Sequence, residues 1–460
     1  MTGWNRSDYP TYFIVMEGDA IDFGRDRVST LFRRMFVPTL FGMLSICVVT
    51  LVDGVFVGHG VGSDGIAAVN ICIPLLMLVT GLGLMLGVGS SVVASLHLSK
   101  DNDKAARINI TQAFIVATLL TVIAGGAVML FPGFTGRLLG SSETLLPMVR
   151  LYLLGMMPGM IFQMCDSIGL FALRLDGSPT LAMWVNVIGA LANVVLDWIF
   201  IFPMQTGVFG AALASSLSMV IGTAIVIAYL GLYSRRLKFY RVKWSRKSLC
   251  LTMRNIGYQC RIGGSALLGE ATMAVLMFMG NVMFMRYLGD AGVGAFGIAC
   301  YYCPFIFMIG NAIAQSAQPI ISYNAGSEPR RAKSVQRYAL AVAVTLGVLL
   351  TLVFTLLPQW LVELFLPLTN RSAQLAVEGL PLFGLGLTFF ILNLVIIGYY
   401  QSIEKSLRAT LIALLRGAIF LIPLFVLLPL WLGAKGIWLA MPVSEFITLF
   451  CSIILFLKNR

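Results

Sequence analysis

The stretch TLVDGVFVGHGVGSDGIAAVNICIPL, from Thr50 to Leu75, decides the fold of this chain. It ends one apolar run, which begins near Met35, and opens the next, with a turn at His59-Gly60 between them. Asp53 lies inside the first run. A carboxylate at the centre of a membrane helix costs about 2.5 kcal/mol or more. A residue kept at that cost is expected to have a function.

The composition predicts a polytopic helical membrane protein. Of its 460 residues, 58% are hydrophobic and only 11% are charged, and its mean hydropathy is +0.90. An apolar run of about 20 residues crosses the hydrocarbon of a bilayer as a helix. Such runs predict an all-α fold with twelve spans, at 35–57, 66–98, 108–131, 146–173, 180–203, 206–233, 257–288, 292–323, 334–357, 374–402, 408–431 and 434–457.

The net charge of +12 is explained by the loops, so we expect no nucleic-acid partner. The two tails and the even-numbered connections, with the adjoining helix ends, hold 27 of the 32 Lys and Arg residues. Basic loops stay on the cytoplasmic side of a membrane. The asymmetry therefore predicts that both termini are cytoplasmic. The other side holds five basic residues: Arg137, Arg150, Arg286, Arg371 and Lys435.

The chain also repeats itself. GSDGIAAV at 62–69 matches GDAGVGAF at 289–296, an offset of 227 residues. A repeat of six spans enters the membrane from the same side twice, which predicts a parallel 6+6 repeat. Two bundles that face each other across a cleft favour a transporter over a channel. The expected parts are a cytoplasmic tail at 1–34, a bundle at 35–233, a basic linker at 234–256 and a second bundle at 257–460.

Buried polar residues of the first half are predicted to meet at one depth. Asp53 in the first span and Asp197 in the fifth both lie about six residues short of the outer end. Asn193 lies one helical turn before Asp197, and Ser215 of the sixth span reaches a similar depth, with Ala211 one turn above it. Oxygen ligands of this kind suit a small hard cation, and paired carboxylates can also share a proton.

The second half lacks these groups. The offset places Gly280 at the position of Asp53, Phe420 at that of Asn193 and Leu424 at that of Asp197. The cation site is therefore expected in the first bundle only. The second bundle has its own buried acid, Glu270, near mid-depth. Weaker candidates, each more often a structural polar contact, are Gln163 with Asp166, Arg416 and Glu445.

Several motifs together resemble one family. VDGVFVGHGVGSDGIAAVNICIPL, GSSVVAS, LRLDGSP and QPIISYNAG, with the 6+6 repeat, are similar to the multidrug and toxic compound extrusion (MATE) transporters. The likeness covers about 30–457 and is strongest to bacterial DinF-type and staphylococcal exporters. It implies a V-shaped pair of bundles in the bacterial inner membrane. It also implies export of organic cations and other toxic compounds in exchange for Na⁺ or H⁺.

The resemblance assigns roles to residues. It implies a cation site made by Asp53, Asn193, Asp197, Ser215 and the carbonyl of Ala211, a hinge at Pro38, and a functional acid at Glu270. Na⁺ needs several ligands whereas a proton needs one carboxylate, so the full set favours Na⁺, with H⁺ as the alternative. No tightly bound cofactor is expected. The expected partners are a cationic, amphipathic small molecule and membrane lipid, around a monomer.

Two other functions are less favoured. A flippase of lipid-linked saccharides belongs to the same fold superfamily, but it would need a cationic cavity for pyrophosphate, whereas the buried charges here are mainly acidic. An enzyme is not expected, because no nucleophile–base constellation is visible in the sequence.

Overall fold

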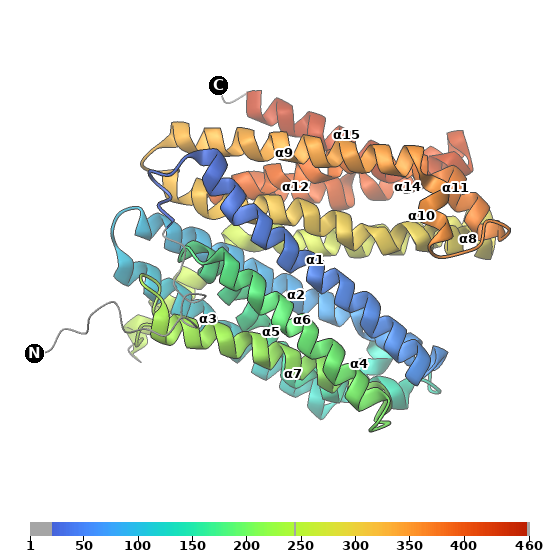
Figure 1. Cartoon of the computed structure of the whole chain (residues 1–460), viewed down its shortest axis with the longest axis horizontal. Coiled ribbons are helices and arrows are strands. Elements are labelled where there is room, and N and C mark those ends of the chain that lie inside the picture. The colour runs from blue at the N-terminus through green and yellow to red at the C-terminus, as the bar shows by residue number, and fades with distance from the viewer. Residues whose placement is uncertain (1–20, 243–244, 458–460) are drawn as a thin grey trace, which may run out of the picture.

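The computed structural model describes residues 21–242 and 245–457. The first 20 residues of the expected tail lie outside that range. The described chain is built from helices (Figure 1), with these bounds: α1 Val28–Gly60, α2 Ser63–Leu98, α3 Asp103–Leu130, α4 Pro132–Leu138, α5 Leu146–Leu175, α6 Pro179–Ile201, α7 Gly207–Ala228, η2 Tyr229–Tyr233, α8 Arg246–Asn324, α9 Pro329–Leu356, α10 Pro358–Glu363, α11 Arg371–Gly384, α12 Leu387–Ser402, α13 Ser406–Leu414, η3 Leu415–Ile419, α14 Leu421–Leu432 and α15 Ala434–Leu457.

The expected spans are present. Within the described residues, eleven helices are long and apolar enough to cross a membrane, and the pair α11 and α12, bent by 46°, makes a twelfth when taken as one span. The boundaries differ by several residues from those expected, and two helix starts differ most. α1 begins at Val28 rather than near 35, and α8 begins at Arg246 rather than near 257. The first turns of both helices contain polar or charged residues, so hydropathy alone placed these turns outside the helices.

The repeated motif marks the same turn twice. Gly62 precedes α2 with a φ of 96°, and Gly289 interrupts α8 with a φ of 63°. Backbone with positive φ is adopted at little cost only by glycine. The interruption divides α8 into two spans, 246–289 and 291–324. The glycine that opens each copy of the motif is therefore needed for the reversal between consecutive spans.

The helices form two groups, one from α2 to α7 and one from α8 to α15, which lie together at one end and diverge toward the other (Figure 1). We call the closed end, where α1 begins and α15 ends, the terminal face. There α2 packs directly on α8. A Cβ atom on Gly89 would lie 2.1 Å from the carbonyl oxygen of Gln259, and one on Gly263 would lie 1.9 Å from that of Met85. Only glycine permits so close a backbone approach.

Polar contacts complete the closure of the terminal face. The Gln318 side chain on α8 donates a hydrogen bond to the Val88 carbonyl on α2 (3.4 Å). The Arg174 guanidinium at the end of α5 donates to the Gln315 side chain on α8 (3.0 Å). These groups are buried, and a buried hydrogen bond is costly to leave unmade. The two bundles are thus joined at the terminal face.

Helix α1 belongs to both groups. At its start, Phe32 packs edge-on against Tyr338 of α9, and Asn324 at the end of α8 donates a hydrogen bond to the Phe23 carbonyl just before α1 (2.9 Å). Farther along, Gly42 lies against Asn186 of α6, where an added Cβ atom would be 3.0 Å from the amide nitrogen. The helix starts on the second bundle and ends on the first, and Pro38 lies in its crossing part.

Candidate cation and substrate cavity

A cavity of about 420 Å³ opens inside the first bundle. Five helices enclose it: α1, α2, α5, α6 and α7. Its wall is mostly apolar, with side chains such as Ile46, Ile73 and Met156. Its polar groups come from all five helices. The cavity therefore combines an apolar surface with a few oriented polar groups, which is usual for small-molecule sites.

Asp53 and Asp197 meet beside this cavity. Asp53 on α1 lines it, and Asp197 on α6 is fully buried next to it. The two carboxyl groups are close enough for a hydrogen bond when one of them carries a proton. Within the described residues, Oδ1 of Asp53 and both carboxyl oxygens of Asp197 are buried without a donor. Buried acceptors are normally satisfied. A proton or a cation between the two carboxylates would satisfy them.

The other predicted ligands lie around this pair. The Asn193 side-chain nitrogen donates to the Ser215 hydroxyl at 3.3 Å, and both residues line the cavity. Ala211, one turn before Ser215 on α7, packs in a buried cluster with Val57 and Ile201. The structure thus gathers side chains from α1, α6 and α7 that are up to 162 positions apart in the chain.

Gln163 and Asp166, which the sequence indicated only weakly, share the same cavity. The Gln163 amide donates to the Thr80 hydroxyl at 2.8 Å, while its carbonyl oxygen is buried without a partner. Oδ1 of Asp166 is also buried without a partner in the described chain. Both residues lie on α5 and line the cavity. The orphan oxygens of the first bundle thus extend beyond the predicted cation ligands.

Sequence reasoning missed five polar residues of the wall: Thr50, Asn70, Tyr152, Asn186 and Ser218. Three of them carried a usable signal. Thr50 lies three residues before Asp53, Asn186 lies seven before Asn193, and Ser218 lies three after Ser215, so each shares a helical face with a predicted ligand. Asn70 and Tyr152 have no predicted ligand at such a spacing on their own helices.

Glu270 lies outside this cavity. It is 8% exposed and lies on α8 beside α2, and a Cβ atom on Gly81 would lie 3.5 Å from the Cβ atom of Glu270. Glu270 is therefore placed between the bundles rather than inside the first one.

Arg416 and Glu445, predicted as separate candidates, are partners. The Arg416 guanidinium donates twice to one Glu445 oxygen (3.0 and 2.8 Å), and Asn393 donates to the other (2.7 Å). The guanidinium also lies over the Phe390 ring at 4.4 Å. Asn393 corresponds to Asp166 at the offset of 227. Where the first bundle has polar cavity residues, the second is filled by a buried ion pair.

These features define a class: a multi-pass helical membrane transporter built from two related bundles, one of which holds a polar cavity with unsatisfied carboxylates. A model of the MatE family matches residues 38–199 and 266–427, once in each half. The chain belongs to the MatE family, whose members are transporters and not enzymes.

Relatives and solved structures extend over nearly the whole chain. The multidrug export protein MepA of Staphylococcus saprophyticus is 25% identical over 443 residues, 91% of each chain. The FAD transporter of Shewanella oneidensis is 23% identical over 436 residues, 91% of this chain and 92% of its own. The outward-facing conformation of a multidrug resistance MATE family transporter superposes with a TM-score of 0.86 at 19% identity, covering 98% of both chains. A transporter from Pyrococcus furiosus gives the same TM-score, covering 95% and 97%.

Proposed function

We propose that this protein exports amphipathic organic cations, drugs among them, from bacterial cells in exchange for Na⁺, by alternating access. The observation that carries the proposal is the first-bundle cavity, in which an apolar wall adjoins carboxylates without donors. A cation in that cavity gains the electrostatic partner that the acids lack, and an apolar body gains contact with the wall.

The proposed coupling site is Asp53, Asn193, Asp197, Ser215 and the Ala211 carbonyl. A coupling ion must bind one conformation better than the other, since only differential affinity moves an equilibrium. Net entry of one positive charge down a membrane potential supplies about 2.3 kcal/mol per 100 mV, or about a fiftyfold concentration ratio. Exchange of one Na⁺ for one monovalent cation moves no net charge and gains none of this free energy, so the Na⁺ concentration gradient then drives the export. H⁺ is the alternative ion, because the same two carboxylates can share a proton.

We propose that the terminal face and both termini lie on the cytoplasmic side of the bacterial plasma membrane, an orientation that the charge asymmetry supports. In that orientation the bundles are closed on the cytoplasmic side and diverge toward the outside. The structure then corresponds to an outward-facing state. The contacts between α2 and α8 support this assignment, because they lie at the terminal face.

Cationic cargo is favoured over anionic cargo. Among the described residues, no Lys, Arg or His lines the cavity, whereas Asp53 and Asp166 do. A flippase for lipid-linked pyrophosphates would need the opposite charge, and the family match does not favour it. The relatives carry different cargoes by name, multidrug export in one and FAD in another. The cavity of this chain, rather than the family, therefore supports the cargo class.

The test is efflux of a fluorescent organic cation from vesicles at fixed pH, with Na⁺ replaced by K⁺ or choline. We expect efflux to stop without Na⁺ in the wild type. Asp53→Asn should abolish efflux with or without Na⁺, and Asp64→Asn, at an exposed position on α2 outside the cavity, is the matched control that should keep Na⁺-dependent efflux. Efflux that ignores Na⁺ and follows an imposed pH gradient would make this a proton site.

A further inference from the structure

A second cavity lies on the terminal face, away from the candidate cation site. It measures about 580 Å³ and forms where α3, the start of α8 and the segment before α8 come together. Four basic residues line it: Lys104 on α3, Arg241 before α8, and Lys247 and Arg254 on α8. No acidic side chain of the described residues lines it. The cavity is therefore strongly cationic.

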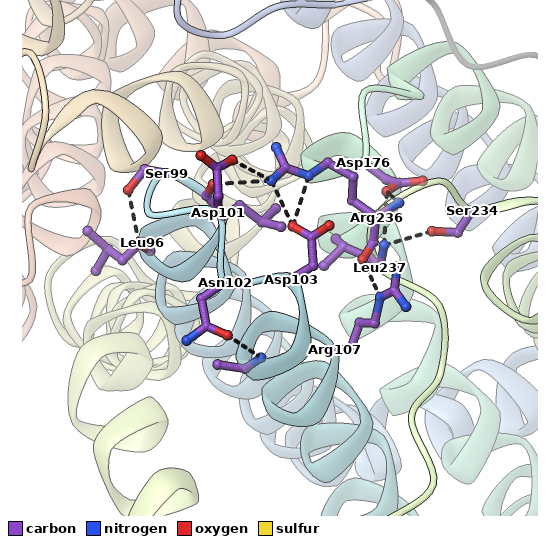
Figure 2. Close-up of polar contacts among 12 residues, drawn as sticks. Leu96, Ser99, Asp101, Asn102, Asp103, Arg107, Asp176, Ser234, Arg236 and Leu237 are labelled. Atoms are coloured by element: carbon purple, nitrogen blue, oxygen red, sulfur yellow. Dashed lines mark hydrogen bonds and ion pairs between the residues drawn. The ribbon is translucent and has the colours of Figure 1, made fainter.

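These four cations lack acidic partners. In the parts of the chain that the structure describes, none of them forms an ion pair, and the Lys104 ammonium lies only over the Tyr240 ring at 5.8 Å. A neighbouring residue behaves differently. Arg236 is paired with Asp103 at 2.7 Å and Asp101 at 3.3 Å (Figure 2). The nearby acids are thus engaged with Arg236 and leave the cavity cations unneutralised.

Residues 235–237, which lead to one wall of the cavity, are held in place by hydrogen bonds. Asp176, which follows α5, accepts hydrogen bonds from the backbone N–H groups of Arg235, Arg236 and Leu237 at 3.1–3.2 Å (Figure 2). The Arg107 side chain donates to the Arg236 carbonyl at 2.8 Å. These two anchors fix the chain that leads to Arg241. An ordered backbone lowers the conformational entropy lost when an anion binds at Arg241.

The rim of this cavity is apolar on one side. Ile108 and Leu251 line it, and Leu249 and Met253 on the first turns of α8 are 60% and 64% exposed. A helix start with exposed apolar and basic residues is typical of the boundary between the hydrocarbon and the headgroups. The cavity therefore offers cations to a head group and apolar surface to a chain.

We propose that this cavity binds a phosphate group, supplied by an anionic phospholipid head group or by a soluble phosphate compound. Phosphate oxygens would be contacted by Lys104 of the first bundle and by Lys247 and Arg254 of the second. Guanidinium and ammonium groups are the usual partners of phosphate. A phosphate bound between α3 and α8 links the two bundles and stabilises the closed terminal face. The binding assignment does not depend on which cargo the protein carries.

The experiment uses the full-length protein in detergent micelles. Retention of phosphatidylglycerol is compared with that of phosphatidylcholine by native mass spectrometry, and inorganic phosphate is titrated as a competitor. The test variant is Lys247→Gln/Arg254→Gln. The matched control, Arg330→Gln/Lys333→Gln, removes two exposed cations from α9 on the same face. Two surface cations lost from a phosphate site weaken binding by about thirtyfold.

The outcomes are distinct. Preferential retention of phosphatidylglycerol, lost in the test variant and kept in the control, supports a lipid site. Binding of inorganic phosphate that is lost in the same variant, without lipid preference, supports a soluble phosphate compound. The charge-conserving variant Lys247→Arg/Arg254→Lys should keep most of the binding, which separates charge from misfolding. Equal retention by the test and control variants would overturn the proposal.

Discussion

The closest contact between the bundles can be tested by adding a single methyl group. A Cβ atom on Gly263 would lie 1.9 Å from the Met85 carbonyl oxygen. Helix α8 would have to move by about 1.5 Å at this point to restore an ordinary contact distance. Overpacking a tight contact costs about 1–3 kcal/mol. Gly263→Ala should therefore weaken the closed terminal face by about fivefold to 150-fold relative to the open one.

The neighbouring glycine gives a matched control. No atom lies within 4 Å of the position that a Cβ atom on Gly264 would take, so Gly264→Ala adds the same methyl group without a collision. Both changes gain about 1 kcal/mol of helix propensity. The difference between the two variants isolates the contact with α2 from the change in helix stability.

The assay is maleimide labelling of a cysteine buried between the bundles. Val92 on α2 is fully buried and packs in a cluster with Ile262 of α8, so Val92→Cys is a conservative probe once the eight native cysteines have been replaced. We expect Gly263→Ala to speed labelling by at least about fivefold. Gly264→Ala should leave the rate unchanged. Equal rates in two folded variants would show that this contact does not control closure.

Three further predictions concern the buried charges. Asp197→Asn should abolish drug resistance, as Asp53→Asn should, while both proteins remain folded and inserted; unchanged resistance at normal expression would make these acids structural. Glu270→Gln should weaken transport of cations more than of neutral cargo, because a desolvated carboxylate favours cations; equal losses in uptake assays would indicate a conformational role. Arg416→Met alone should cost about 3–5 kcal/mol of stability by leaving a buried charge, and Arg416→Met/Glu445→Leu should regain most of it; thermal unfolding that ranks the double variant lower would contradict this.

The overall fold could be predicted from the hydropathy of the sequence and from its internal repeat. Span positions came from long apolar runs, and the offset of 227 residues predicted two related halves. The structure adds that Gly62 and Gly289 of the repeated motif make the reversals. The boundaries at Val28 and Arg246 did not follow, because their flanking residues are polar and only contacts with the rest of the protein fix them as helix. The bend of 46° between α11 and α12 was not predicted either. Such a bend depends on packing that hydropathy does not record.

The candidate site was partly predictable. The depth of a residue along a helix can be counted from the sequence, whereas the direction in which its side chain points around the helix can be inferred only in part. Equal depth brought Asp53 and Asp197 together correctly. The pairing of Arg416 with Glu445 was missed, because depth alone gives no reason for these two helices to turn those faces to each other. Asp166 was a weaker candidate in the sequence, and the structure places it in the wall of the same cavity. Such pairings require the rotation of each helix about its axis, which the structure supplies.

The difference between the bundles suggests how a change at Asp53 would act. The second bundle is filled by Phe284, Phe296 and Trp438, with the ring centroid of Phe284 4.6 Å from that of each of its two neighbours. Close-packed interiors resist deformation and transmit strain. The first bundle is hollow beside Asp53, so a bound ion can change its packing at lower cost. Because α1 ends on the first bundle and starts on the second, at the contact of Phe32 with Tyr338, we expect that change to reach the second bundle along a single helix.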